Sequence, residues 1–373
     1  MTGIYVHIPF CMQKCLYCDF PSYGGISSYQ EDYVAALCRE IGASSYAGGE
    51  ADTLYFGGGT PSLLTAEQVD RIMAAVRATF SLGADAEITL EANPDSMDKE
   101  YAKELAALGI NRVSLGVQSF GDETLRFLRR IHTAEEAVRA VEDVYAAGIG
   151  NISVDLIYGL PGQSAAALRC DVETLLSLPI THASLYSLIV EAHTPLERLV
   201  AAGRVSLPSV EEVEAAGTLI REAMAASGFV HYEISAYCRP GYASRHNIKY
   251  WTYEPYIGFG ASAHSFDGKT RFANESNIPV YIKQAGKTSV VAEKEDIDTE
   301  RGEEDYCFLA LRMRDGIDGN RFRDLFGRTV EAAFGPVLPE LRAKGFLEKT
   351  ARGYKLTKRG LPYGNYVFGR FLR

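Results

Sequence analysis

The stretch YVHIPFCMQKCLYCDF, residues 5–20, joins a β-strand pattern to three closely spaced cysteines. Alternation of its first residues predicts a strand over Ile4–Ile8. Cys11, Cys15 and Cys18 follow with the spacing C-x3-C-x2-C. Ligands of parallel α/β proteins bind where the strands end. The stretch therefore predicts an α/β fold with a thiol-rich site at the carboxyl end of its first strand.

The same order, a short strand and then an amphipathic helix, repeats over the first 190 residues. Strands separated by helical crossovers must be parallel, so we expect either an open doubly wound sheet or a barrel, complete or partial. The predicted strands are Ile4–Ile8, Thr53–Phe56, Glu87–Glu91, Arg112–Val117, Ile152–Tyr158 and Ala183–Ser187. The predicted helices lie at about residues 29–46, 65–80, 98–108, 122–147 and 164–177.

Polar or glycine-rich sequence follows every predicted strand. The six segments are PFCMQKCLYCDF, GGGTPS, EANPDS, GVQSFG, DLIYGLPGQ and YSLIVE. Because the carboxyl ends of parallel strands meet at one edge, these segments predict a single large site built from six loops.

The alternation of strands and helices stops after about residue 190. A helical pattern near residues 209–227 leads into a Tyr-, Gly- and His-rich region that contains the only tryptophan, Trp251. Further helices and a hairpin in FLEKTARGYKLT resemble a winged-helix module. We therefore divide the chain into a partial barrel (1–230), a connecting region (231–295) and a C-terminal α+β, winged-helix-like domain (296–373).

The composition is that of an ordinary globular protein, with 47% hydrophobic and 23% charged residues. A formal net charge of −10 argues against nucleic acid as a partner. Residues 341–373 differ, because they hold nine Lys or Arg and the single acid Glu348. We interpret this tail as a solvated basic face, with docking to an acidic partner, DNA or a lipid surface as the alternatives. Without a signal peptide or a long apolar run, we expect a cytoplasmic protein.

The three clustered cysteines are better explained as metal ligands than as disulfide partners. Zinc is one alternative, but a structural zinc site needs four ligands, and we expect the nearby His7 to pack within its strand. A cubane iron-sulfur cluster held by three thiolates keeps one iron open for a substrate with amino and carboxylate groups, such as S-adenosylmethionine. The other cysteines, Cys38, Cys170, Cys238 and Cys307, are scattered, and we expect most of them in the core.

The cysteine spacing, with the aromatic Tyr17 before the last cysteine, resembles the radical S-adenosylmethionine superfamily. Across almost its whole length the chain resembles the family that contains oxygen-independent coproporphyrinogen III oxidase and the HemW-type haem chaperones. The resemblance is carried by YVHIPFCMQKCLYCDF (5–20), LYFGGGTPS (54–62), LEANPDS (90–96), GVQSF (116–120), RRIH (129–132), VDLIYGLPGQ (154–163), HYEIS (231–235) and HNIKYW (246–251).

This resemblance implies a partial (β/α)6 TIM-like barrel in which Cys11, Cys15 and Cys18 ligate a 4Fe-4S cluster. It also implies the residues that contact S-adenosylmethionine, namely Tyr5, Tyr17, Gly58, Gly59, Thr60, Glu91, Gln118, Arg130 and Asp155.

Residue chemistry supports several of these roles. Gly57–Gly59 leave room for a ligand amino group, although a tight turn explains them equally well. Glu91 can accept hydrogen bonds from ribose or amino groups, and Gln118 and Asp155 can hold the sugar. Arg130 can pair with the methionyl carboxylate, although it also fits a solvated helix end.

Two departures favour the chaperone over the decarboxylating oxidase of porphyrin biosynthesis. The oxidase has a further cysteine where this chain has Phe20, and an N-terminal extension where this chain begins ten residues before Cys11. The H-N-x-x-Y-W element resembles the chaperone group, in which it has been linked to haem binding; its residues are His246, Asn247, Tyr250 and Trp251. His231, Cys238 and His264 are rival haem ligands.

The resemblance also implies partners. We expect haem, acceptor haemoproteins such as membrane respiratory proteins, and a reductant protein such as flavodoxin or ferredoxin. Peripheral membrane contact through the basic tail and a homodimer are further expectations.

Overall fold

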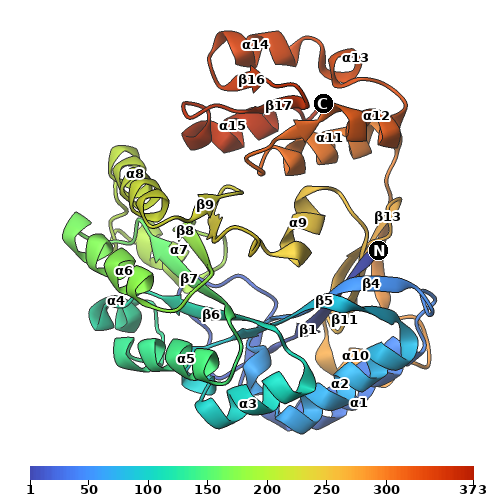
Figure 1. The fold of residues 1–373 in the computed structure, drawn as a ribbon. Coiled ribbons are helices and arrows are strands. Elements are labelled where there is room, and N and C mark those ends of the chain that lie inside the picture. Colours follow the sequence, from blue (N-terminus) through green and yellow to red (C-terminus); the bar gives the residue numbers. More distant parts are fainter.

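The computed structural model describes all of residues 1–373 and confirms the predicted α/β fold. One twelve-stranded sheet dominates it (Figure 1). Six of its strands are adjacent in sequence order and parallel throughout, as the sequence predicts. They are β1 (Thr2–Ile8), β4 (Glu50–Gly58), β5 (Ser81–Ala92), β6 (Arg112–Gln118), β7 (Asn151–Tyr158) and β8 (His182–Ser187).

Helices between these strands and after β8 form the outer layer of the partial barrel. The predicted helix 122–147 is wrong as a single element, because it divides into α4 and α5 with Thr133 as the N-cap of α5. Thr133 and Glu136 form a capping box, which starts a new helix at that point. The helices are α1 (Gln30–Gly42), α2 (Ala66–Thr79), α3 (Lys99–Leu108), α4 (Asp122–Phe127), α5 (Ala134–Ala146), α6 (Ala165–Ser177), α7 (Pro195–Ala201) and α8 (Val210–Ala226).

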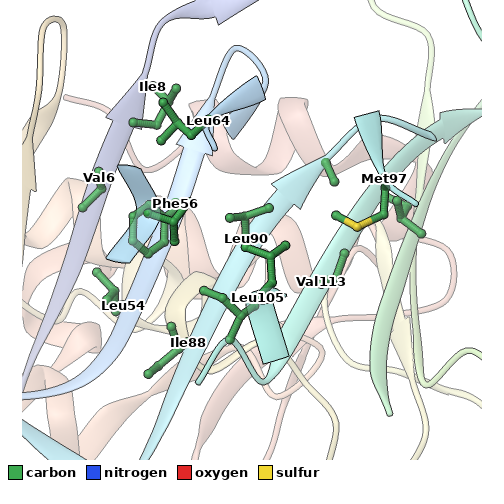
Figure 2. Close-up of a cluster of buried hydrophobic side chains, with 14 of the residues drawn as sticks. Val6, Ile8, Leu54, Phe56, Leu64, Ile88, Leu90, Met97, Leu105 and Val113 are labelled. Carbon is green, nitrogen blue, oxygen red and sulfur yellow. The ribbon is translucent and has the colours of Figure 1, made fainter. Parts of the chain in front are cut away.

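The two faces of the parallel strands differ in character. Residues such as Leu54, Phe56 and Leu90 point toward the helices and form a core of 54 buried residues (Figure 2). The alternating positions carry polar or aromatic side chains on the opposite, concave face, for example Thr53 and Tyr55. The sheet therefore separates an apolar helix layer from a polar interior.

The connecting region adds strands to both ends of this sheet, which the sequence does not predict. Next to β1 lies β11, a seventh parallel strand, followed by three antiparallel strands. Next to β8 lie two short antiparallel strands. These elements are β9 (Val230–His231), β10 (Ala236–Cys238), β11 (Tyr256–Phe259), β12 (His264–Phe266), β13 (Thr270–Asn274), α10 (Ile278–Gln284) and β14 (Val291–Asp296).

The C-terminal module contains the predicted hairpin and has a second core, which also takes Tyr253 and Phe266 from the connecting region. Helix α9 (Arg245–Trp251) lies between this module and the large sheet (Figure 1). The three-part division of the chain stays a prediction. The module comprises α11 (Thr299–Ala310), β15 (Ile317–Asp318), α12 (Gly319–Phe326), α13 (Val330–Phe334), α14 (Val337–Ala343), β16 (Leu347–Lys349), β17 (Gly353–Leu356) and α15 (Gly364–Gly369).

Short elements complete the chain. The cysteine loop is bracketed by β2 (Phe10–Cys11) and β3 (Tyr23–Gly24), which pair with each other, and single 3-10 turns occupy 27–29, 61–63, 94–96 and 361–363. No helix reaches the length and apolar character of a membrane span.

Candidate functional site

The cysteine loop leaves the carboxyl end of β1 and is anchored by Leu16. The Leu16 amide donates to the Leu128 carbonyl at 3.1 Å, and its carbonyl accepts from the Leu196 amide at 3.0 Å. Tyr17 packs against a small apolar cluster that includes Leu128 and Leu160. These contacts fix the middle of the loop, whereas all three of its cysteines are unpaired and partly exposed.

The surroundings of the thiols suit a bound iron-sulfur cluster. The Thr60 hydroxyl lies 3.6 Å from the Cys11 sulfur, and the Arg130 guanidinium lies 3.3 Å from the Cys15 sulfur. A Cβ atom on Gly59 would lie only 3.1 Å from the Cys11 sulfur, so glycine keeps space open there. No three His, Cys, Asp or Glu side chains are close enough to hold one metal ion. No preformed zinc ligand set is therefore present, whereas the three unpaired thiols stay available to a cluster.

The glycine loop at the end of β4 packs directly on aromatic rings. A Cβ on Gly57 would lie 2.9 Å from the Tyr5 ring and 3.0 Å from the Tyr55 ring. Gly58 has a φ of 114°, and a Cβ there would lie 2.6 Å from the His7 ring. Gly57 therefore requires glycine for space, and Gly58 requires it for both space and backbone conformation.

Glu91, at the end of β5, is tied to the glycine loop. One carboxylate oxygen accepts from the Tyr55 hydroxyl at 2.7 Å, and the other accepts from the Gly58 amide at 3.1 Å. Burial raises the pKa of Glu91 to about 7. The carboxyl group is thus held rigidly beside the loop and exchanges its proton near neutral pH.

Arg130, Gln118 and Asn93 gather around Gly116. The Arg130 Nη2 donates to the Asn93 side chain at 2.6 Å and to the Gly116 carbonyl at 2.5 Å. Its Nε is buried without a partner, so one donor remains for a ligand carboxylate. Gln118 has a φ of 72°, unusual for a residue other than glycine, and a Cβ on Gly116 would lie 3.1 Å from its Nε2. Arg130 is therefore packed into the site and is not a solvated helix end.

Asp155 lies on the concave face of β7, among serines of three adjacent strands. Its carboxylate is 3.5 Å from the Ser114 hydroxyl and 3.4 Å from that of Ser153, and Ser184 also bonds to it. Burial raises the pKa of Asp155. The structure thus brings Cys11, Gly58, Glu91, Gln118, Arg130 and Asp155 to the same end of the barrel, while their individual contacts with S-adenosylmethionine stay predictions.

The sequence analysis misses the polar residues deeper in the barrel. Arg112 is only 1% exposed, and its Nε and Nη1 have no hydrogen-bond partner. Tyr55 and Asn93 contact predicted site residues but are not predicted themselves. Strict alternation in runs such as RVSLGVQ is the available signal, since strands of a parallel sheet covered on both faces are normally apolar throughout.

The H-N-x-x-Y-W element forms helix α9, capped by Ser244. His246 is 1% exposed; its Nδ1 lies 2.8 Å from the Thr53 hydroxyl and its Nε2 lies 2.8 Å from the Tyr250 hydroxyl. Burial, with Lys249 nearby, lowers the pKa of His246 to about 3. In this conformation the ring is neutral and neither nitrogen is free to bind iron.

An aromatic pocket of about 320 Å³ lies beside α9, against β11–β13 and α11. Tyr250 and Trp251 line it from one side, and Phe266 and Phe308 are also part of its wall. The indole nitrogen of Trp251 is buried without a partner. The pocket therefore offers flat apolar surfaces together with the charged side chains of Glu254, Arg271 and Asp305.

The rival haem ligands lie elsewhere. His231 is held by the Ile234 carbonyl at 3.1 Å and stacks on Tyr237. Cys238 is buried in β10, and His264 is exposed on β12. Neither histidine nor Cys238 lines the aromatic pocket.

Most of the basic tail is neutralised within the fold. Six of its nine cations form ion pairs, with acids that include Asp318, Glu331 and Glu340. These six are Lys344, Lys349, Arg352, Lys355, Arg370 and Arg373. The tail therefore has much less free charge than its sequence suggests.

Comparison with known proteins gives the same family along the whole chain. Residues 5–173 match the Radical SAM superfamily, and residues 304–363 match the HemN C-terminal domain. The heme chaperone HemW of Bacillus subtilis is 38% identical, over 100% of this chain and 99% of its own length. HemW of Escherichia coli is 33% identical, with 99% and 98% covered.

A solved structure supports the fold. Coproporphyrinogen III oxidase (HemN) from Escherichia coli, described as a radical SAM enzyme, superposes with a TM-score of 0.85. Its sequence is 23% identical, and the match covers 99% of this chain and 89% of that one.

Proposed function

The chain belongs to the radical SAM superfamily and, within it, to the HemW family, and on that premise we propose that it is a haem chaperone. It would hold a 4Fe-4S cluster and S-adenosylmethionine, bind haem as cargo and pass it to acceptor haemoproteins. The observation that carries the proposal is the aromatic pocket beside α9, because it lies on the H-N-x-x-Y-W element within an otherwise complete radical SAM scaffold.

The cofactor end of the barrel has a defined part in this proposal. Cys11, Cys15 and Cys18 would ligate the cluster, which supplies an open iron for the amino and carboxylate groups of S-adenosylmethionine. Arg130 would orient the carboxylate with its free Nε, and Glu91 would accept from the amino group or the ribose. Leu16 and Tyr17 keep the loop in place for these contacts.

Haem would enter the aromatic pocket with its macrocycle against Tyr250 and Trp251. Arg271, also in the pocket wall, would supply a cation for a propionate. His246 could ligate iron only after its contacts with Thr53 or Tyr250 are broken. We therefore propose a first, pocket-bound state of haem that does not use this histidine.

Haemin titration followed by optical spectra tests the proposal. Wild type should bind one haem. Trp251→Ala should weaken haem binding roughly tenfold or more, because it removes the flat surface. The optical spectrum of His246→Ala should reveal whether the axial ligand of the iron changes. Phe346→Ala, in the C-terminal module but outside the pocket, is the matched aromatic control. Absence of stoichiometric haem binding by wild type would refute the chaperone function.

Oxidative decarboxylation of coproporphyrinogen III is the second candidate, because the fold matches that oxidase closely. Phe20 stands where the oxidase has a further cysteine, and its side chain is 62% exposed beside the cluster loop. An anaerobic assay for protoporphyrinogen IX separates the two functions, since robust turnover would contradict the chaperone assignment.

We further propose a cytoplasmic location and a reductant protein of the flavodoxin or ferredoxin type. All seven cysteines are free, as suits a reducing compartment, and a low-potential cluster needs an electron donor. Membrane delivery would have to use surfaces other than the paired cations of the tail.

A further inference from the structure

Three aromatic rings form a stack inside the barrel, beneath the glycine loop. The His246 ring lies 5.0 Å from the Tyr55 ring with an interplanar angle of 24°. The Tyr5 ring lies 6.3 Å from Tyr55 and 6.4 Å from His246, at 25° and 28°. The stack therefore joins α9 to two strands that end at the cofactor site.

The glycine loop rests on this stack without intervening side chains. Any Cβ on Gly57 would lie inside ordinary van der Waals contact with both Tyr5 and Tyr55, at 2.9 Å and 3.0 Å. A shift of either ring would consequently move the backbone that we propose to receive S-adenosylmethionine.

Two chains of hydrogen bonds lead from the stack to the cofactor end. In the first, the Tyr55 hydroxyl donates to Glu91 at 2.7 Å and Glu91 accepts from the Gly58 amide at 3.1 Å. In the second, the Tyr5 hydroxyl lies 3.0 Å from the His7 Nδ1, and the His7 Nε2 lies 3.0 Å from the Pro21 carbonyl. Because a carbonyl only accepts, the His7 Nε2 carries the proton and Tyr5 donates to Nδ1.

The opposite side of the stack is equally constrained. His246 is fixed by Thr53 through Nδ1 and by Tyr250 through Nε2, and Tyr250 also lines the aromatic pocket. A ligand that displaces Tyr250 changes the support of the His246 ring, and through it the packing on Tyr55.

We propose that Tyr55 is a positioning residue that holds Glu91 and the glycine loop in the shape that binds S-adenosylmethionine, and that the His246–Tyr55 stack couples this site to the pocket beside α9. The second half rests on the proposed function, since it takes haem as the ligand of that pocket. Coupling of two binding equilibria is reciprocal, so each ligand must change the affinity of the other by the same factor.

Tyr55→Phe tests the positioning role of Tyr55, because it removes only the hydroxyl and keeps the ring stacked. In anaerobically reconstituted protein, we expect S-adenosylmethionine affinity to fall roughly tenfold in equilibrium dialysis, as loss of a hydrogen bond to a carboxylate predicts. The paramagnetic resonance spectrum of the reduced cluster should need correspondingly more S-adenosylmethionine for its shift. Tyr354→Phe is the matched control, since that hydroxyl donates to the Glu331 carboxylate at 2.8 Å in the C-terminal module, outside both the cofactor end and the aromatic pocket.

The coupling between the two sites is tested by measuring haemin affinity with and without saturating S-adenosylmethionine. We expect the two values to differ roughly fivefold in wild type and Tyr354→Phe, and to agree within about twofold in Tyr55→Phe. Unchanged S-adenosylmethionine affinity in a folded Tyr55→Phe protein overturns the positioning role. A wild-type ratio near one, or a ratio that Tyr55→Phe leaves intact, overturns the coupling. Failure of wild type to bind haemin at all refutes the haem function instead, while the dialysis result still decides the role of Tyr55.

Discussion

The two ends of the barrel interior differ in how many of their polar groups already have partners. At the carboxyl end, partly exposed thiols, an unpartnered Arg130 Nε and a glycine loop without side chains leave a shape that is ready for a ligand. At α9, the His246 ring is buried and satisfied at both nitrogens. The cofactor end is therefore preorganised, whereas His246 must give up contacts before it can act on a ligand.

The largest effect should come from the cluster ligands. Cys15→Ala removes one of three thiolates, so we expect loss of the 4Fe-4S cluster, measured as iron and sulfide content after anaerobic reconstitution. Cys170→Ala, a lone exposed cysteine on α6, is the control and should keep the cluster. A fully loaded Cys15→Ala protein would contradict the assignment of the preorganised end.

Gly58→Ala tests whether the backbone conformation of the glycine loop maintains the cofactor end of the barrel. Its positive φ and the 2.6 Å approach to the His7 ring should together lower the free energy of unfolding by about 3 kcal/mol. Gly148 has a similar φ of 95° but open space around it, so Gly148→Ala should cost only about 1 kcal/mol in urea unfolding. Equal costs would show that the contact with His7 does not matter.

The stability that the buried His246 in α9 contributes should depend on pH. The pKa of His246 is lowered to about 3 in the folded state from its ordinary 6.5, so the unfolded chain takes up the proton first. Stability contributed by the neutral ring is present above about pH 6.5 and is lost as the pH falls toward 3.

Between pH 6 and pH 4 we expect this residue to account for about 2 kcal/mol of the decline in the free energy of unfolding. His246→Gln should reduce this decline in the free energy of unfolding, whereas the control substitution His264→Gln, at an exposed position, should not. Burial also lowers the pKa of His7, His182 and His231, so part of the decline should remain in the variant.

The smallest effect concerns the wall of the aromatic pocket. The Arg271 guanidinium pairs with Asp305 at 2.7 Å and joins β13 to α11 across the pocket. Arg271→Ala should cost about 1 kcal/mol, because Arg301 stays 3.4 Å from the same carboxylate, and loss of the pocket cation should slow haemin association in stopped-flow measurements. Arg352→Ala, which breaks an exposed pair, should cost less stability than Arg271→Ala and leave the rate unchanged.

The six parallel strands and the placement of the cysteine loop could be predicted because each strand has its own periodicity and its own loop at the end. Strands β9–β14 could not, since they are two to six residues long and lie in Tyr- and Gly-rich sequence without a periodic signal. Their pairing depends on the edge strands β1 and β8, which are distant in the sequence.

The candidate site divides in the same way. Gly58 and Glu91 stand in motifs at strand ends and Arg130 stands in the RRIH motif after α4, so the sequence points to all three as candidates. The state of His246 depends on Thr53, which lies 193 residues away, and its burial follows from packing that no local motif encodes. The sequence therefore marks α9 as a candidate haem-binding element but does not predict that His246 is buried and hydrogen-bonded at both nitrogens.

The partial barrel never closes, so its sheet ends in two free edges, and strand β14 forms one of them. Every residue of β14 is exposed, and it ends in four consecutive charges, Glu293, Lys294, Glu295 and Asp296. Charged side chains along an unpaired edge repel a second strand that would otherwise extend the sheet. The barrel can thus stay open and its interior accessible, while the charged edge disfavours edge-to-edge polymerisation of the protein.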